Sequence, residues 1–183
     1  MGLKLFGRNI FQIYTHYIMK IEYETYSRET EQSSYTLRKI DNDSISEELA
    51  SIGTTVTVSN LKQLLQINGS RCEGFVFGKA DTSIGTIWVM YRGANDLEYR
   101  IRNIDAYIFD VYVNSKHRGK GYAGEMIRQL MKYLHNKGIS TAHLAVSKSN
   151  TSAIRAYKKT GFTTVTDKRF ARFLKINIPY QKL

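Results

Sequence analysis

The pattern of apolar and polar positions along the 183-residue chain predicts strands and helices most clearly in its second half. Apolar and aromatic residues dominate 104–113, which indicates a buried central strand. After a polar, glycine-bearing loop, apolar residues recur every three to four positions between Tyr122 and Leu134, the spacing of one helical face. The other elements predicted here are a strand at 140–146, a helix at 150–160 and two closing strands at 162–166 and 169–178.

The first half of the chain predicts further strands and two short helices. The expected elements are a strand at 35–40, helices at 45–51 and 59–67, and strands at 73–79 and 84–91. Together they predict one mixed α/β domain over residues 35–183. Residues 1–34 are interpreted as an N-terminal extension, because a polar stretch separates them from the domain. Their aromatic, basic sequence leaves open an extra hairpin, a homodimer contact or a weak interfacial anchor.

Composition excludes several classes of protein. Apolar residues make up 42% of the chain and aromatic residues 12%, too much for a globally disordered chain. The single cysteine, Cys72, excludes an intramolecular disulfide and a cysteine-based zinc site, and favours a reducing, cytoplasmic environment. The four histidines show no metal-ligand spacing, so we expect no metal. No apolar run reaches the length of a membrane span, so we expect none.

Charge is distributed unevenly along the chain. The sequence has 27 lysines and arginines against 16 aspartates and glutamates, a net charge of +11. Residues 92–183 hold 18 basic and 6 acidic side chains, so the positive excess belongs to this half. Such a field favours a polyanionic partner: nucleic acid, an anionic membrane or a multiply phosphorylated small molecule.

A glycine-rich loop, Arg-Gly-Lys-Gly-Tyr-Ala-Gly at 118–124, follows the predicted central strand and opens the predicted helix. Unpaired N–H groups at a helix start bind phosphate. The same sequence is also compatible with an ordinary basic loop that binds no ligand. The loop also matches G-x-G-x-x-G, but a dinucleotide site needs an acidic residue about 20 positions later. No acidic residue occurs between Glu125 and Asp167, and no Walker sequence is present.

Two sequence blocks carry a resemblance to a known family. Arg118 to Ala123 matches the pattern R/Q-x-x-G-x-G/A, five residues after the expected end of the central strand. A second block matches N-x-x-A-x-x-x-Y-x-x-x-G-F from Asn150 to Phe162. With both blocks at the usual separation, the chain resembles the GNAT N-acetyltransferase superfamily. The resemblance covers residues 73–166 well and 35–72 only by the order of elements.

The resemblance implies an α/β fold in which a mixed central sheet contains two splayed parallel strands and is flanked by helices. It implies acetyl-CoA as cosubstrate, with no metal. The implied contacts to acetyl-CoA come from the end of the central strand (Val111, Tyr112, Val113), the loop and helix start (Arg118, Gly119, Lys120, Gly121, Tyr122, Ala123, Gly124) and the second block (Asn150, Ala153).

The resemblance also implies catalytic roles for two residues. Tyr157 would protonate the departing CoA thiolate, and a phenol does keep its proton at neutral pH. Asp110 is the first candidate for the base that deprotonates the amine, with Asp105 and Glu98 as alternatives. Other roles stay open: Asp110 binding only the substrate's charge, and Tyr157 packing in the core. Asn150 capping a helix is compatible with ligand binding.

The expected function is therefore acetyl transfer to a primary amine of a small molecule or protein, by direct attack in a ternary complex. Strand alternation places Asp110 and Tyr112 on one face, which would be the acceptor side. The rivals are a catalytically inactive CoA-binding protein and a basic nucleic-acid-binding module. Because the string typical of sheet-based RNA readers is missing, no nucleic-acid partner is expected.

Overall fold

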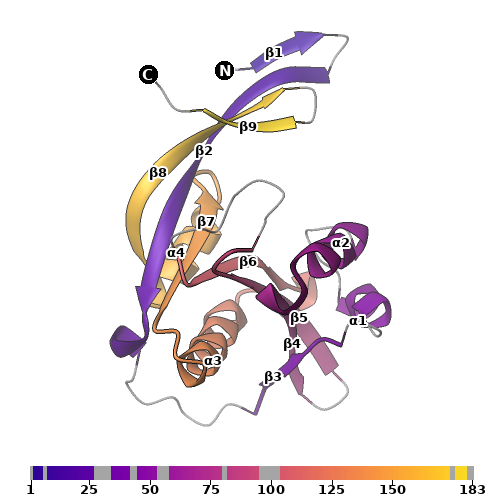
Figure 1. Cartoon of the computed structure of the whole chain (residues 1–183), viewed down its shortest axis with the longest axis vertical. Coiled ribbons are helices and arrows are strands. Elements are labelled where there is room, and N and C mark those ends of the chain that lie inside the picture. Colours follow the sequence, from indigo (N-terminus) through magenta and orange to yellow (C-terminus); the bar gives the residue numbers. More distant parts are fainter. Residues whose placement is uncertain are drawn as a thin grey trace.

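The computed structural model describes residues 2–5, 8–26, 34–41, 45–52, 58–79, 82–94, 104–173 and 176–180. In these residues nine strands form one sheet in the order β3-β4-β5-β6-β7-β2-β8-β9, with β1 paired to β2 (Figure 1). The strands are β1 (Gly2–Leu5), β2 (Arg8–Glu22), β3 (Thr36–Lys39), β4 (Cys72–Lys79), β5 (Thr82–Tyr91), β6 (Ala106–Val113), β7 (Thr141–Ser147), β8 (Thr163–Phe173) and β9 (Ile176–Tyr180). The α-helices are α1 (Ile45–Ile52), α2 (Val58–Asn68), α3 (Tyr122–Asn136) and α4 (Thr151–Lys159).

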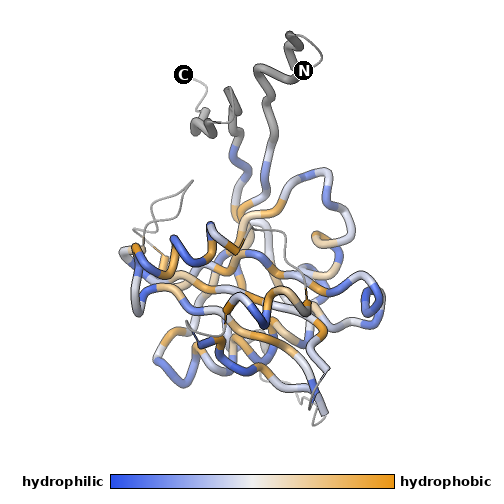
Figure 2. The backbone as a smooth tube through the Cα atoms, turned by 90° about the vertical axis from the view of Figure 1, so that its right-hand side faces the viewer, coloured by the Kyte–Doolittle hydropathy of each residue, from blue (hydrophilic) through white to orange (hydrophobic). Residues whose placement is uncertain are grey.

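Helices cover both faces of the sheet and form two hydrophobic clusters. One cluster joins α3 and α4 to residues such as Phe75, Ile108 and Leu144. The other joins α1 and α2 to residues such as Trp88 and Met90. We call these sides the α3/α4 face and the α1/α2 face. Figure 2 shows hydrophobic positions concentrated in the middle of the molecule, with mostly hydrophilic loops at its margins.

The sheet confirms the expected fold class. Among the described strand pairs, β6–β7 is parallel and the others are antiparallel, so the sheet is mixed. The helices and strands expected between residues 35 and 160 all occur, with ends displaced by a few residues.

Two parts of the sheet differ from the sequence expectation. The expected strands at 162–166 and 169–178 are instead one long strand, β8, followed by β9, because β8 runs without a turn along its partner β2. β2 itself comes from the segment that the sequence set apart as an extension. It lies between β7 and β8 and pairs with both, while β1 and β2 form a hairpin.

Buried residues show how closely β2 belongs to the core. Met19 is 0% exposed and Ile21 is 1% exposed, and both lie in the α3/α4 cluster. β7, which borders the candidate site, therefore has β6 on one side and β2 on the other.

Candidate active site

The candidate site begins where β6 and β7 stop pairing. The parallel ladder joins Ala106 to Ala142 and ends at the pair Ile108–Leu144. β6 nevertheless continues to Val113, and β7 continues to Ser147. Beyond this point β6 keeps a partner only in β5 among the described residues. One edge of β6 is therefore left open to an added extended chain.

A β-bulge at Asp110 lies just after the point where β6 stops pairing with β7. Asp110 has a φ of +43°, the left-handed region that non-glycine residues seldom adopt, and the pairing with β5 shifts register between Thr86 and Trp88. Before the bulge, Ile108 lies on the α3/α4 face; after it, Val111 and Val113 do. The alternation has thus slipped by one residue.

This slip bears on the predicted acceptor face. Tyr112 packs against the α1/α2 cluster, opposite Val111 and Val113, as the sequence predicts. Asp110 lies at the interruption, so strand alternation no longer assigns its face. After burial, the charge of its carboxylate contributes to the raised pKa of Tyr157, a member of the α3/α4 cluster.

The backbone of β6 after the bulge presents hydrogen-bonding groups toward β7. Asn114 donates its N–H to the Ile84 carbonyl on β5 at 2.9 Å, and the Tyr112 carbonyl also faces β5 at Gly85. Because alternate residues of a strand point their backbone groups to opposite sides, Val111 and Val113 turn theirs toward β7. These are the groups that would pair with the amides of a pantetheine arm.

The side chain of Arg118 contacts the end of β6, which the sequence did not predict. Its Nε donates to the Val113 carbonyl at 3.0 Å, and its guanidinium lies over the Tyr112 ring, 5.6 Å from the centroid. The side chain therefore closes the loop onto the end of β6. This contact uses the same carbonyl that an added extended chain would meet.

The glycine loop leads into α3 as expected. Gly119 has a φ of +79° and Gly121 a φ of +81°, conformations that require glycine, and Gly121 is the N-cap residue of α3. No side chain caps the first N–H groups of the helix. Arg118, Lys120 and Gly121 are exposed. Helix-start N–H groups without a side-chain cap, beside exposed positive charge, are suited to an anionic group.

Gly124 brings the loop close to the second sequence block. A Cβ on Gly124 would lie 2.9 Å from Cγ2 of Thr160, at the end of α4. α3 and α4 therefore pack together where α3 begins, and Ala123 and Ala153 are half-buried members of the same cluster.

Tyr157 projects from α4 into the α3/α4 cluster and is 9% exposed. Burial raises the pKa of Tyr157 to about 12, and the negative charge of Asp110 is a second, smaller cause of this rise. Its ring lies 5.8 Å from that of Phe162. The raised pKa keeps the phenol protonated at neutral pH, so its hydroxyl can donate a proton to a ligand.

Asn150 caps α4, the alternative that sequence left open. Its Oδ1 accepts hydrogen bonds from the Ala153 N–H at 3.2 Å and the Ser152 hydroxyl at 3.1 Å. The amide NH₂ of Asn150 is on an exposed side chain, so capping leaves its two donors for a ligand.

The alternative bases have different surroundings. Asp105 forms an ion pair with Arg92 at the far end of β6 from the glycine loop. Glu98 lies outside the described residues. Tyr122, one of the implied acetyl-CoA contacts, directs its hydroxyl to that of Tyr35. The sequence held no signal for this contact, nor for the bulge at Asp110.

The described residues contain neither a metal-binding cluster nor a membrane-spanning helix. They contain no group of three or more histidine, cysteine, aspartate or glutamate side chains arranged to hold a metal ion. Within the same part of the chain, every helix is too short or too polar to cross a membrane.

Comparison with known proteins decides the family. Residues 55–162, more than half of the chain, match the model of the acetyltransferase (GNAT) family. The chain belongs to the GNAT acetyltransferase family. The open edge of β6, the glycine loop, Asn150 and Tyr157 all lie within the matched residues.

Two curated relatives of this GNAT chain carry acetyltransferase names. It is 33% identical over 69 residues to the uncharacterized N-acetyltransferase YobR of Bacillus subtilis, which covers 37% of this chain and 28% of YobR. It is 36% identical over 62 residues to the [ribosomal protein bS18]-alanine N-acetyltransferase of Haemophilus ducreyi, covering 34% of this chain and 43% of that protein. The matched segments thus span less than half the length of either relative.

A solved structure supports the fold. A predicted acetyltransferase from Clostridium acetobutylicum, crystallised with acetyl-CoA, superposes with a TM-score of 0.52 and 19% sequence identity, covering 72% of this chain and 91% of that one. At this identity the likeness establishes the shared fold, a GNAT sheet with helices on both faces.

Proposed function

We propose that this GNAT chain transfers the acetyl group of acetyl-CoA to a primary amine of a small molecule or peptide, by direct attack in a ternary complex. One observation carries the proposal. The β6–β7 ladder ends at Ile108 and Leu144, next to the Asp110 bulge, and a buried, protonated Tyr157 lies within electrostatic reach of that carboxylate. This combination of an open strand edge, a carboxylate and a protonated phenol supports acetyl transfer.

The described residues fit acetyl-CoA as cosubstrate. Val111 and Val113 offer backbone groups to the pantetheine amides, with the Asn150 amide as a further donor. The N–H groups around Gly121 suit the pyrophosphate, assisted by the charge of Lys120. The Val113 carbonyl already accepts a hydrogen bond from Arg118 Nε, and its second lone pair remains for a pantetheine amide.

The proposed chemistry needs one base and one acid. A neutral amine forms a bond to the acetyl carbon, and the bond from that carbon to sulfur breaks. Asp110 accepts the proton that the amine gives up, directly or through water. Tyr157 donates its proton to the thiolate, whose own pKa rises in the same buried surroundings. The products are an acetylated amine and CoA.

The acceptor is defined only by class. The Haemophilus relative is named for a ribosomal protein's alanine, which supports testing peptide N-terminal amines beside small amines. The single, buried Cys72 supports a reducing, cytoplasmic environment for this reaction.

The direct test measures CoA release from acetyl-CoA with a panel of amines: amino acids, polyamines, aminoglycosides and peptides with free N-termini. We expect release above the rate without amine for at least one class, and loss of that release in Tyr157→Phe. Binding of acetyl-CoA without release for any amine would instead indicate an inactive CoA-binding protein. Absence of both binding and release would overturn the proposal.

A further inference from the structure

A polar stripe runs along α3 and faces β3 and β4. Tyr122, Gln129 and Tyr133 are spaced seven and four residues apart, which places them on one side of the helix. Each makes a hydrogen bond to β3, to β4 or to the residue before β3. The rest of the helix is held by apolar contacts in the α3/α4 cluster.

The stripe begins at the first residue of α3. The Tyr122 hydroxyl donates to the Tyr35 hydroxyl at 3.2 Å, which raises the pKa of Tyr122. The two rings are 5.0 Å apart, and Tyr35 also stacks on Phe77 of β4 at 5.7 Å. Tyr122 directly follows Gly121, the N-cap of the helix. This contact is therefore adjacent to the expected phosphate donors.

Gln129 holds the same strand two turns further along. Its Nε2 donates to the Tyr35 carbonyl at 2.7 Å, and its Oε1 accepts from the Leu37 N–H at 2.8 Å. The side-chain amide thus pairs with the backbone of β3, the edge strand, in the manner of a neighbouring strand. Both groups of Tyr35, hydroxyl and carbonyl, are bonded to α3.

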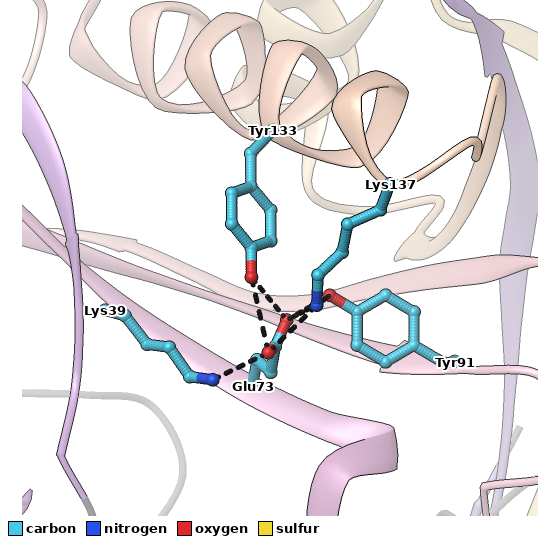
Figure 3. A network of polar contacts seen from close by, with 5 residues as sticks. All are labelled: Lys39, Glu73, Tyr91, Tyr133 and Lys137. Carbon is cyan, nitrogen blue, oxygen red and sulfur yellow. Dashed lines mark hydrogen bonds and ion pairs between the residues drawn. The ribbon is translucent and has the colours of Figure 1, made fainter.

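The stripe ends in a buried charge cluster (Figure 3). Glu73 of β4 is 5% exposed and forms ion pairs with Lys39 at 2.7 Å and Lys137 at 2.9 Å. The hydroxyl of Tyr133 donates to the same carboxylate at 3.1 Å, and Tyr91 donates to it as well. The C-terminal end of α3 is therefore tied to β3, β4 and β5.

These bonds fix where α3 lies along its axis. Apolar contact has no direction, so hydrophobic packing alone tolerates a small slide of a helix over a sheet. Hydrogen bonds have narrow distance and angle ranges and remove that freedom. The N–H groups at the start of α3 have to meet a phosphate with sub-ångström accuracy, so the bond nearest to them matters most.

We infer that Tyr35 is a positioning residue for acetyl-CoA binding, acting through its hydrogen bond to Tyr122. The inference rests on the proposed function and extends the cosubstrate site to a residue outside both family blocks. Tyr35 touches no part of the ligand in this account. It holds the start of α3 in place.

The test compares tyrosine-to-phenylalanine variants, which each lose one hydroxyl. Acetyl-CoA affinity is measured by calorimetry for Tyr35→Phe, Tyr122→Phe and the double variant. We expect Kd to rise about fivefold in each single variant, the effect of one neutral hydrogen bond, with no further rise in the double variant because both lose the same bond. At saturating acetyl-CoA, kcat of Tyr35→Phe stays unchanged.

Tyr133→Phe is the matched control, because it removes a hydroxyl from the same stripe at the opposite end of the helix. Its Kd is expected to stay within about twofold of the wild-type value. The inference is overturned if Tyr35→Phe binds acetyl-CoA with the wild-type Kd. It is also overturned if the change in binding free energy of the double variant equals the sum of the changes in the two single variants. A wild-type chain that binds no acetyl-CoA overturns the proposed function instead.

Discussion

Asp110 combines backbone strain with a functional position. A positive φ at a non-glycine residue costs free energy and persists only where the surrounding structure enforces it. Here it accompanies the end of the β6–β7 ladder and the one-residue slip in side-chain alternation between Ile108 and Val111. The same residue raises the pKa of Tyr157, so its backbone shapes the site while its charge acts on the phenol.

Replacing Asp110 by asparagine tests the charge without disturbing the bulge, since asparagine tolerates the left-handed conformation. We expect kcat/KM for the amine to fall about 10²-fold, the usual contribution of a general base. KM for acetyl-CoA should change little. Asp105→Asn, which removes the ion pair with Arg92 at the opposite end of β6, is the control; an equal loss in both variants would argue against Asp110 as the base.

Tyr157→Phe tests the acid. It removes the hydroxyl and keeps the packing with Phe162, so stability should hold while kcat falls about 10²-fold. Because the pKa of Tyr157 is raised to about 12, the wild-type phenol keeps its proton throughout the neutral and mildly alkaline range. The pH profile of kcat should accordingly show no falling limb from Tyr157 below pH of about 10. Unchanged turnover in Tyr157→Phe would assign the proton to another donor.

The N-terminal segment contributes a strand, β2, to the central sheet and to the hydrophobic core. Its inner residues fill the α3/α4 cluster, and it separates β7 from β8 by pairing with both. Because β2 pairs with the edge of β7 that faces away from β6, it holds β7 in place beside the open edge of β6.

Met19→Ala measures that support. Met19 is fully buried, so truncation should lower the free energy of unfolding by about 2–4 kcal/mol, followed by urea denaturation. Ile67→Ala, at a position 48% exposed on α2, is the control and should cost about 0.5 kcal/mol or less. Equal effects of the two substitutions would mean that β2 is an appendage to the fold.

Sequence predicted the elements whose signals are local. α3 has a regular apolar period, and Gly121 and Gly138 mark its ends, so its bounds were nearly correct. β2 was not placed, because its partners Leu144 and Thr164 lie more than 100 residues away and no local pattern encodes such pairing. The candidate site was predictable where motifs fix single residues. The bulge and the Tyr35–Tyr122 contact depend on tertiary packing and were not.

For the whole molecule, the positive charge has a specific internal use as well as a surface one. Lys39 and Lys137 neutralise Glu73 between α3 and three strands. Burial opposes ionisation of Glu73, but hydrogen bonds from Lys39, Tyr91 and Lys137 outweigh it and lower its pKa to about 2. The loop charges at Arg118 and Lys120 match a phosphate ligand.

The lowered pKa of Glu73 predicts a pH dependence of stability. Its contribution is fully present above the ordinary pKa of 4.5 and is lost as the pH falls from there toward 2. Glu73→Gln should therefore destabilise the chain by about 1–2 kcal/mol at pH 7, because it removes the ion pairs of a buried carboxylate with two lysines that are partly screened by water. The gap between the wild-type and variant unfolding free energies should narrow below pH 4.5. A gap independent of pH would contradict this role.

In the proposed complex, acetyl-CoA lies along the open edge of β6 and against the start of α3. Amide hydrogen exchange with and without acetyl-CoA tests it at the residues concerned. We expect acetyl-CoA to slow exchange at Val111, Val113 and the amides from Gly119 to Gly124, with little change in α1 and α2. No slowing at these amides, or slowing confined to other parts of the basic surface, would contradict it.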